Sequence, residues 1–465
     1  MLHPDRLFSS EPIKRGIARD LYSAIKDLPI VSPHGHTDPK WFAQNKAFDN
    51  PAELLIQADH YLLRMLYSQG ISLESLGIGK NQENVEQDTQ KIWALFSKYY
   101  YLFQGTPTQL WLDYVFSEVF SINEPLNEKS ADTYYQHINR CLKTDAFKPR
   151  ALFDQFKIET LATTESALDD LSHHKTIRES DWQGNVITAF RPDNVIDPEF
   201  EGFEQNLAEL SSLTNENLLT FNSYLNSLRT RRAFFKEMGA TSTDHGHLSS
   251  RTLDLTSPEK EKLYQTIRSG KFTCEEADCF RAQMLTEMAE MSINDGLVMQ
   301  IHPGVHRNHN DFLFNNFGRD KGADIPIATE YVQNLKPLLN KFGNNPDFTL
   351  IIFTLDESTY ARELAPLAGH YPALKTGPAW WFNDSPEGMR RYRQQVTETA
   401  GFYNTVGFND DTRAFLSIPA RHDLARRMDS VMLAELVSDH RLTETQAHTL
   451  AYDLTYTLAK KAYKI

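Results

Sequence analysis

Short apolar runs alternate with longer segments of helical spacing along most of the chain. Eight of these runs, rich in apolar or β-branched residues, have the length of strands. They lie at residues 28–31, 158–164, 185–193, 236–247, 296–304, 348–356, 371–382 and 404–411. Because strands that alternate with helices form parallel sheets, eight such units predict a closed (β/α)8 barrel of the TIM type. An open doubly wound sheet is the alternative, but it favours a glycine-rich phosphate loop after its first strand.

One connection is much longer than the others. Residues 42–150 have helical spacing almost throughout and separate the first strand from the second. A connection of that length forms a substructure of its own. We therefore expect residues 1–41 and 151–465 to form the barrel and residues 42–150 to form a helical subdomain that contributes a lid to the barrel mouth. The aromatic residues of this insertion, from Trp93 to Phe120, are expected to pack in its core.

Composition and charge narrow the class of protein. The 465 residues carry a formal net charge of −14, which argues against a nucleic-acid or membrane-surface binder because those surfaces are themselves anionic. Three cysteines in so long a chain form no disulfide framework and indicate a reducing compartment. No run approaches the length of a membrane span, and the first residues lack a basic-then-apolar signal, so we expect a cytoplasmic protein. We expect no nucleotide cofactor, and assembly into a homo-oligomer stays open.

Polar side chains follow several of the predicted strands, at the end where barrel enzymes place their active sites. The first strand ends in Pro-His-Gly-His, which puts His34 and His36 on one side of an extended backbone. Two solvated histidines in a turn are the alternative. The fifth strand supplies His302, and the eighth supplies Asp410 and Asp411, which compete as the functional carboxylate. Side chains of these types suit zinc or a similar divalent ion.

Further candidates lie near the other strand ends or in the insertion. Those near strand ends are Arg191, Asp244, His245, Arg307, Trp380, Trp381 and Arg413. Arginines are more often ion-pair residues and tryptophans more often core residues, but their joint occurrence at strand ends favours a common site. His60 and Tyr61 open the inserted region and could close over that site as a lid; the alternative is an ordinary amphipathic helix. Residues 420–427 are expected to form a polar, solvated stretch of helix.

An ordered set of motifs over residues 33–423 gives the chain a family resemblance. The chain resembles the uronate isomerases, the aldose-ketose isomerase branch of the amidohydrolase superfamily, through PHGHTDP, DHYLLR, TAFRPD, TDHGH, QIHPGVHRN, KTGPAWWFNDSPEGM and GFNDDTRAFLSIPARHD. The resemblance implies a (β/α)8 barrel. It also implies interconversion of D-glucuronate with D-fructuronate, and of D-galacturonate with D-tagaturonate, in hexuronate catabolism.

The same resemblance implies roles for individual residues. The metal ligands fall on His34, His36 and Asp411, with His302 near or in the site. We expect one divalent metal ion, with zinc as the first choice. Asp411, His60 and Tyr61 take the catalytic positions. The substrate-binding positions fall on Arg191, Asp244, Arg307, the Trp380 and Trp381 pair, and Arg413.

Isomerisation of an aldose to a ketose moves a proton from C2 to C1 through an enediolate. We expect Asp411 to be the base and an arginine to bind the C6 carboxylate, with Arg191 the first candidate and Arg307 the second. Residues 354–356 end the sixth strand without a histidine, which gives little support to a binuclear hydrolase. A metal-dependent amidohydrolase or lactonase on the same barrel is the main alternative. A non-catalytic sugar-acid binding protein is the other.

Overall fold

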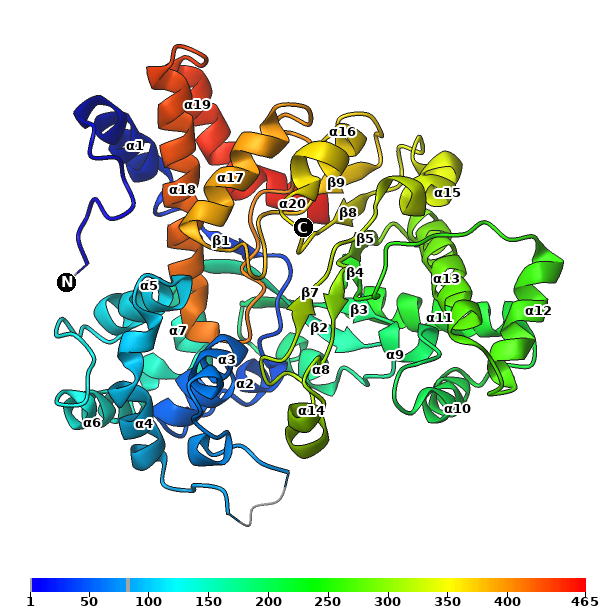
Figure 1. Ribbon diagram of the computed structural model, residues 1–465, viewed down its shortest axis with the longest axis horizontal. Helices are drawn as coiled ribbons and strands as arrows, with labels where there is room; N and C mark the ends of the chain where they lie inside the picture. The colour runs from blue at the N-terminus through cyan, green and yellow to red at the C-terminus, as the bar shows by residue number, and fades with distance from the viewer. Residues whose placement is uncertain (1, 81–83) are drawn as a thin grey trace.

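The computed structural model describes residues 2–80 and 84–465. Seven parallel strands pair side by side at its centre, in the order β1-β2-β3-β4-β5-β8-β9 (Figure 1). Helices connect the strands, so the curled sheet has the TIM-like architecture predicted from the sequence. Seven of the eight predicted runs supply a strand. The strands are β1 (Ile30–Ser32), β2 (Ile158–Ser166), β3 (Asn185–Arg191), β4 (Ser242–His245), β5 (Val298–Ile301), β8 (Leu350–Ile352) and β9 (Leu374–Thr376).

The eighth run departs from a regular strand. Within the described chain, residues 404–411 form one isolated parallel bridge, from Thr405 to β9. Gly407 has a φ of 76°, a left-handed conformation that interrupts the pleat of a strand. The chain nevertheless returns to the first strand at this point, because the backbone N–H of His36 donates to the carbonyl oxygen of Thr412 at 3.1 Å.

Helices precede, interrupt and surround the sheet. Helix α1 (Pro12–Ile25) precedes β1. The insertion between β1 and β2 contains α2 (Pro39–Gln44), α3 (His60–Ser68), α4 (Thr89–Lys98), α5 (Pro107–Tyr114), α6 (Ala131–Leu142) and α7 (Pro149–Gln155). The barrel and C-terminal helices are α8 (Ser172–Arg178), α9 (Asp193–Ile196), α10 (Phe203–Thr214), α11 (Phe221–Glu237), α12 (Ser257–Arg268), α13 (Cys274–Asp295), α14 (Asp311–Phe317), α15 (Val332–Phe342), α16 (Ala365–Ala368), α17 (Pro386–Thr397), α18 (Ile418–Ser438), α19 (Glu444–Tyr452) and α20 (Leu458–Tyr463). Short 3-10 and π-helical segments lie at Glu53–Gln57, Glu74–Leu76, Tyr100–Phe103, Val115–Val119, Asp145–Phe147, Tyr360–Leu364, Phe415–Ser417 and Asp453–Thr457.

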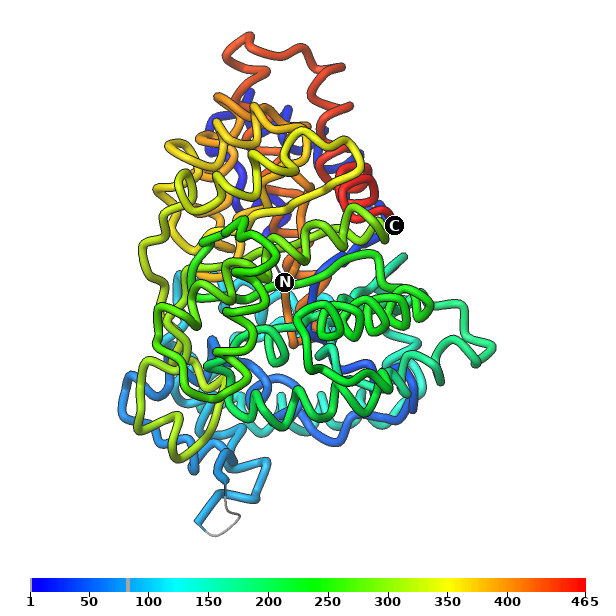
Figure 2. The backbone as a smooth tube through the Cα atoms, turned by 90° about the vertical axis from the view of Figure 1, so that its right-hand side faces the viewer, coloured from blue at the N-terminus to red at the C-terminus, as the bar shows by residue number. Residues whose placement is uncertain are grey.

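The helices of the insertion pack around an aromatic core, as predicted. Trp93 and Phe96 are fully buried there. The same apolar cluster continues into Ile30 of β1 and Leu161 of β2, so the insertion rests on the first two strands. In both Figure 1 and Figure 2 these helices lie at the lower end of the molecule, with α19 at the upper end. The division into a barrel domain and a lid subdomain stays a prediction.

A small antiparallel ladder follows β5 and had no signal in the sequence. Strand β6 (Val305–His306) pairs with β7 (Ile325–Pro326), and the loop between them carries α14. Gly322 in this loop has a φ of 79°, and a Cβ atom there would lie 2.8 Å from the carbonyl oxygen of His60. The loop therefore lies against the start of α3, where the predicted lid residues are.

Helix α18 differs from the solvated helix expected for residues 420–427. Arg421, Arg426 and Arg427 are all buried, because the helix packs against α1, α5 and α17. Their charges have partners: Arg421 lies 2.8 Å from Asp384, and Arg426 donates to backbone carbonyls just before β1. The expectation of a solvated stretch was wrong.

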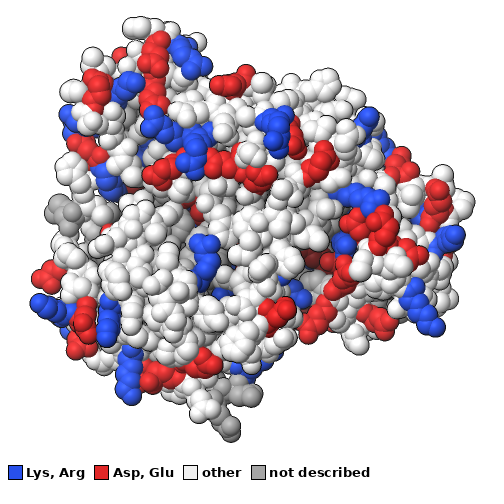
Figure 3. Space-filling view, viewed as in Figure 1, with Lys and Arg blue, Asp and Glu red and all other residues white. Residues whose placement is uncertain are grey.

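The surface carries mixed charge. On the face shown in Figure 3, acidic and basic side chains are interspersed instead of being separated by sign. Across the described ranges, no helix has both the length and the apolar character needed to cross a bilayer.

Candidate active site and metal centre

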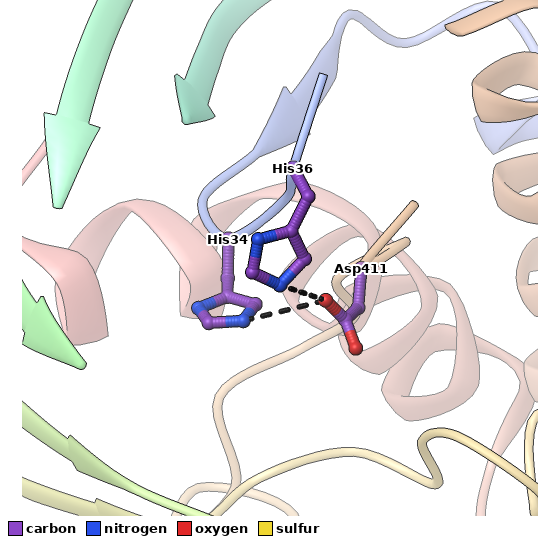
Figure 4. A group of neighbouring side chains, drawn as sticks. All are labelled: His34, His36 and Asp411. Carbon is purple, nitrogen blue, oxygen red and sulfur yellow. Dashed lines mark ion pairs between the residues drawn. The ribbon is translucent and has the colours of Figure 1, made fainter. Parts of the chain in front are cut away.

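His34, His36 and Asp411 meet at the carboxyl end of the barrel (Figure 4). The histidines follow β1, and Asp411 ends the eighth run. Oδ1 of Asp411 lies 3.4 Å from Nε2 of His34 and 3.1 Å from Nε2 of His36. Asp411 has a φ of 39°. Aspartate adopts this left-handed conformation more readily than most other non-glycine residues, because its short polar side chain can hydrogen-bond locally.

The three side chains form a candidate metal site. Among the described residues, their ligand atoms lie within 4.8 Å of one another. Burial lowers the pKa of His36 to about 4, which favours the neutral imidazole that a metal ligand needs. Burial acts in the same direction on His34, but Asp244 and Asp411 outweigh it and raise the pKa of His34. Burial opposes ionisation of Asp411, but contacts with His34 and His36 outweigh it and hold the pKa of this carboxyl well below its usual range. The buried Oδ1 of Asp411 faces both imidazoles but has no hydrogen bond of good geometry among the described residues. An ion held between the three side chains would satisfy this oxygen.

His302 lies beside this group and turns toward Asp244. Its ring centroid is 6.2 Å from that of His34, and its Nε2 is 2.7 Å from Oδ1 of Asp244. Asp244 is fully buried and also lies 3.3 Å from Arg191. Burial opposes its ionisation, but His302 and Arg191 hold the pKa of Asp244 well below its usual range. His302 therefore links the candidate metal site to a buried carboxylate and an arginine, and its role as a ligand stays a prediction.

A cavity of about 320 Å³ adjoins these residues. Of the twelve predicted site residues, ten line it: His36, His60, Tyr61, Arg191, His302, Arg307, Trp380, Trp381, Asp411 and Arg413. The other two, His34 and Asp244, are buried beside it. His245, also at the end of β4, points elsewhere and contacts the carbonyl oxygen of Gln300 at 2.9 Å. Residues from distant parts of the chain thus converge on one cavity, as predicted.

The predicted lid residues and the tryptophan pair line one part of the cavity. His60 and Tyr61 begin α3 with their rings stacked 4.8 Å apart. The ring of His60 also lies 5.8 Å from that of Trp381. The indole N–H of Trp380 donates to Oδ2 of Asp411. Both tryptophans therefore lie at the site, one against the predicted base and the other against the predicted lid.

Each of the three predicted arginines lies against an aspartate. The pairs are Arg191 with Asp193 at 2.9 Å, Arg307 with Asp324 at 2.9 Å, and Arg413 with Asp320 at 3.1 Å. A ligand carboxylate that binds any of these guanidinium groups must share it with the aspartate already present.

Some residues at the cavity escaped the sequence analysis. The hydroxyl of Tyr61 donates to Asp384 at 3.1 Å, and Asp384 pairs with Arg421, whose guanidinium lies 3.6 Å from the ring centroid of Trp111. Only the fold brings these four residues together. His247 is buried at the cavity, and within the described chain neither ring nitrogen is hydrogen-bonded, although Nε2 lies 3.8 Å from Asp193. Its position in the TDHGH motif was the available signal.

Sequence and structure comparisons agree on one family. The family model for glucuronate isomerase matches residues 10–463. The uronate isomerase of Sphingopyxis alaskensis is 61% identical over 468 residues, covering 100% of this chain and 99% of the relative. The crystal structure of glucuronate isomerase from Caulobacter crescentus has a TM-score of 0.98 at 58% identity, covering 100% of this chain and 97% of that one. The structure of uronate isomerase from Thermotoga maritima has a TM-score of 0.93 at 26% identity, covering 100% and 99%. The chain therefore belongs to the glucuronate isomerase family.

Proposed function

We propose that the chain isomerises hexuronates, converting D-glucuronate to D-fructuronate and D-galacturonate to D-tagaturonate. Its membership of the glucuronate isomerase family over nearly the whole chain supports this activity. The observation that carries the proposal at the site is the position of Asp411, beside His34 and His36 in a cavity lined by arginines. A buried carboxylate can accept a proton there, and arginines suit an anionic sugar.

The reaction moves hydrogen between two carbons of an open-chain sugar. The base takes the proton from C2, the C2–H electrons form the enediolate, and C1 receives a proton, while one hydroxyl hydrogen passes between O2 and O1. Asp411 is ionised, because His34 and His36 hold the pKa of its carboxyl low, and it can therefore accept the C2 proton. The same shift weakens its basicity, so the carbonyl must be polarised to acidify that proton.

A divalent ion would be held by His34, His36 and Asp411, and we expect zinc for two imidazoles and a carboxylate. When bound, such an ion supplies Lewis-acid polarisation of sugar oxygens. The carboxylate of Asp411 presents Oδ1 to the histidines and Oδ2 to the indole of Trp380. We assign Oδ1 to the ion and Oδ2 to the proton, which lets one side chain serve both roles.

A second group must carry the hydroxyl hydrogen between the two sugar oxygens. Burial and the charge of Asp384 raise the pKa of Tyr61 well above its usual range, so its phenol stays protonated and can donate. Burial lowers the pKa of His60, so its imidazole is neutral and can accept or donate. We assign the relay to these two residues. Trp380 and Trp381 limit the access of water to the enediolate.

Incubation of the metal-replete protein with D-glucuronate tests this proposal. We expect D-fructuronate to accumulate, and D-tagaturonate to accumulate from D-galacturonate. In D2O, proton transfer should place deuterium at C1 of the ketose. Complete retention of the substrate hydrogen would instead indicate hydride transfer or a base shielded from solvent. Failure to form a ketose from either sugar would exclude the proposed activity.

A further inference from the structure

Three buried side chains from distant parts of the chain meet around Tyr61. Asp384 lies in the loop between β9 and α17, Arg421 lies in the first turn of α18, and Trp111 lies in α5 of the insertion. All three are buried. Burial of a charge is costly unless a group of opposite sign lies close to it, so Arg421 and Asp384 depend on each other at this position.

One oxygen of Asp384 joins Tyr61 to Arg421. Oδ2 of Asp384 accepts a hydrogen bond from the hydroxyl of Tyr61 at 3.1 Å and another from Nη1 of Arg421 at 2.8 Å. The bond between the two charged groups is the stronger of the two kinds, so Arg421 anchors the carboxylate and the carboxylate in turn anchors the phenol. The position of the Tyr61 hydroxyl therefore depends on where Arg421 holds Asp384.

The same nitrogen of Arg421 also contacts the backbone beside the proposed base. Nη1 donates to the carbonyl oxygen of Asp410 at 3.3 Å, and Asp411 is the next residue. Tyr61 begins a helix of the insertion, whereas Asp411 ends the eighth run of the barrel. Arg421 is therefore a common anchor for two groups that the chain itself places far apart.

Aromatic contacts fix the ring of Tyr61 as well as its hydroxyl. The guanidinium carbon of Arg421 lies 3.6 Å from the ring centroid of Trp111 and 5.7 Å from that of Tyr61. The two rings meet edge to face, with their centroids 5.6 Å apart. A planar guanidinium stacks on such a ring in a way that the ammonium of lysine does not. Arg421 thus restrains both the plane of the phenol and the direction of its hydroxyl.

We propose that Arg421 is a positioning residue that, through Asp384, holds the hydroxyl of Tyr61 in register with Asp411 for the hydrogen relay. This inference rests on the proposed function, which gives Tyr61 the relay and Asp411 the role of base. Arg421 transfers no proton itself, because an arginine keeps its charge in proteins. A misplacement of about 1 Å can cost about 100-fold in rate, so loss of this anchor acts on turnover more than on binding.

A double-mutant cycle in the metal-replete protein tests whether Arg421 acts through Tyr61. Arg421→Gln should lower kcat for D-glucuronate by about 100-fold with little change in KM. In the Tyr61→Phe background there is no hydroxyl left to place, so the same substitution should lower kcat by about tenfold at most, through the lost contact with the carbonyl of Asp410. Tyr61→Phe should keep measurable turnover because His60 shares the relay.

Arg393→Gln is the matched control. Arg393 is also a buried arginine, lies 2.6 Å from Asp429, and has its guanidinium carbon 5.2 Å from the ring centroid of Tyr392. Any effect of Arg393→Gln on kcat should be equal with and without the hydroxyl of Tyr61, because this pair has no link to it. Arg421→Lys should recover part of the kcat lost in Arg421→Gln, since it keeps a positive charge beside Asp384.

A spectroscopic measurement reports on Tyr61 without turnover. In protein labelled with [ζ-¹³C]tyrosine, the signal of Tyr61 is the one that disappears in Tyr61→Phe. This signal should shift in Arg421→Gln and stay at its parental position in Arg393→Gln. Asp384→Asn keeps the shape of the carboxylate but not its charge, and it should shift the signal too, so it replaces Arg421→Gln if that variant does not fold.

Two results would overturn the assignment. One is an equal loss of kcat from Arg421→Gln in the parent and Tyr61→Phe backgrounds, which would mean that Arg421 acts independently of Tyr61. The other is a Tyr61 signal that does not move in the variants of Arg421 and Asp384. A parent protein that forms no ketose would contradict the proposed function, whereas a shifted signal in that same protein would still support the placement of Tyr61 by Arg421.

Discussion

Nε2 of His422 lies 3.0 Å from Oδ2 of Asp410, and both side chains are buried. Asp410 is thereby directed to α18, whereas its neighbour Asp411 turns to His34 and His36. The left-handed conformation of Asp411 separates the two adjacent carboxylates. Sequence analysis found both residues equally suited to chemistry, and the structure gives each a different partner.

Asp411→Asn should abolish most turnover while leaving the fold intact. The amide keeps the shape of the side chain but cannot accept the C2 proton, so we expect kcat to fall by about 10²- to 10⁴-fold, as for loss of a general base. Steady-state kinetics with D-glucuronate measure the loss, and circular dichroism checks the fold. Near-normal activity would remove Asp411 as the base.

Asp410→Asn is the matched control at the neighbouring position. It removes a carboxylate from the buried pair with His422, which should destabilise the protein by about 1–3 kcal/mol. We expect a lower thermal midpoint. The kcat of the folded protein should stay within about tenfold of the parent value, whereas loss of a general base lowers kcat by about 10²- to 10⁴-fold. A kcat loss equal to that of Asp411→Asn would show that the two carboxylates act together.

Removal of a candidate ligand should remove the metal. After chelation and dialysis against Zn²⁺, the parent protein should hold one ion per chain. His36→Ala should bind zinc at least about 100-fold more weakly, because even the loss of a residue that only supports a ligand lowers metal affinity by about 10- to 100-fold. Elemental analysis measures the content. His309→Ala removes an imidazole from the loop pair of His306 and His309 and should leave the content unchanged. Equal zinc in the parent and His36→Ala would place the ion elsewhere.

The fold and the first part of the candidate metal site were predictable because they depend on local pattern. The apolar run before His34 predicts a strand end, and the spacing of His34 and His36 puts both imidazoles on one side of it. Asp411 needed the family resemblance, since a carboxylate at a turn is also a common helix cap. The eighth strand could not be judged from its residue types, because the effect of Gly407 depends on the φ that it adopts.

The partners of charged residues were not predictable. Arg421 occurs in a helical stretch whose pattern is the same whether its charged face meets water or buried counter-ions. Its partner Asp384 is 37 residues away, and its aromatic contact Trp111 lies in the insertion.

Gly322→Ala should test whether the loop between β6 and β7 must lie on α3. A Cβ atom at this position would lie 2.7 Å from Cβ of Arg64 and 2.8 Å from the carbonyl oxygen of His60, so the loop has to move away from the start of α3. We expect kcat/KM for D-glucuronate to fall by about tenfold, a loss of about 1.4 kcal/mol in transition-state binding.

Gly296→Ala separates this effect from backbone strain. Gly296 follows α13 in a left-handed conformation with a φ of 80°, but a Cβ atom there would meet open space. Both variants carry the strain of an alanine at positive φ, about 1 kcal/mol. Only Gly322→Ala adds the clash with α3, so only it should lower kcat/KM. Equal kinetics in the two variants would contradict a role for this contact.

Glu165 should make the protein less stable as pH rises. It lies at the end of β2, buried beside Thr188 and His174. Burial raises the pKa of its carboxyl from 4.5 to about 8. Because the folded state holds the proton more tightly than the unfolded state, the stabilisation is complete below pH 4.5 and is lost as pH rises through about 8. Each unit of pKa difference corresponds to about 1.4 kcal/mol.

Glu165→Gln should therefore be more stable than the parent at pH 8.5 and similar to it near pH 4.5, because glutamine is neutral at every pH. Denaturant unfolding across this range measures the difference. Glu159→Gln gives the opposite sign. Burial opposes ionisation of Glu159, but Lys460 and Tyr456 outweigh it and lower the pKa of Glu159. Its charged form therefore stabilises the fold above pH 4.5, so this variant should be the less stable one at neutral pH and converge with the parent on acidification. A stability difference for Glu165→Gln that stays constant from pH 4.5 to 8.5 would mean that Glu165 does not hold its proton in the folded protein.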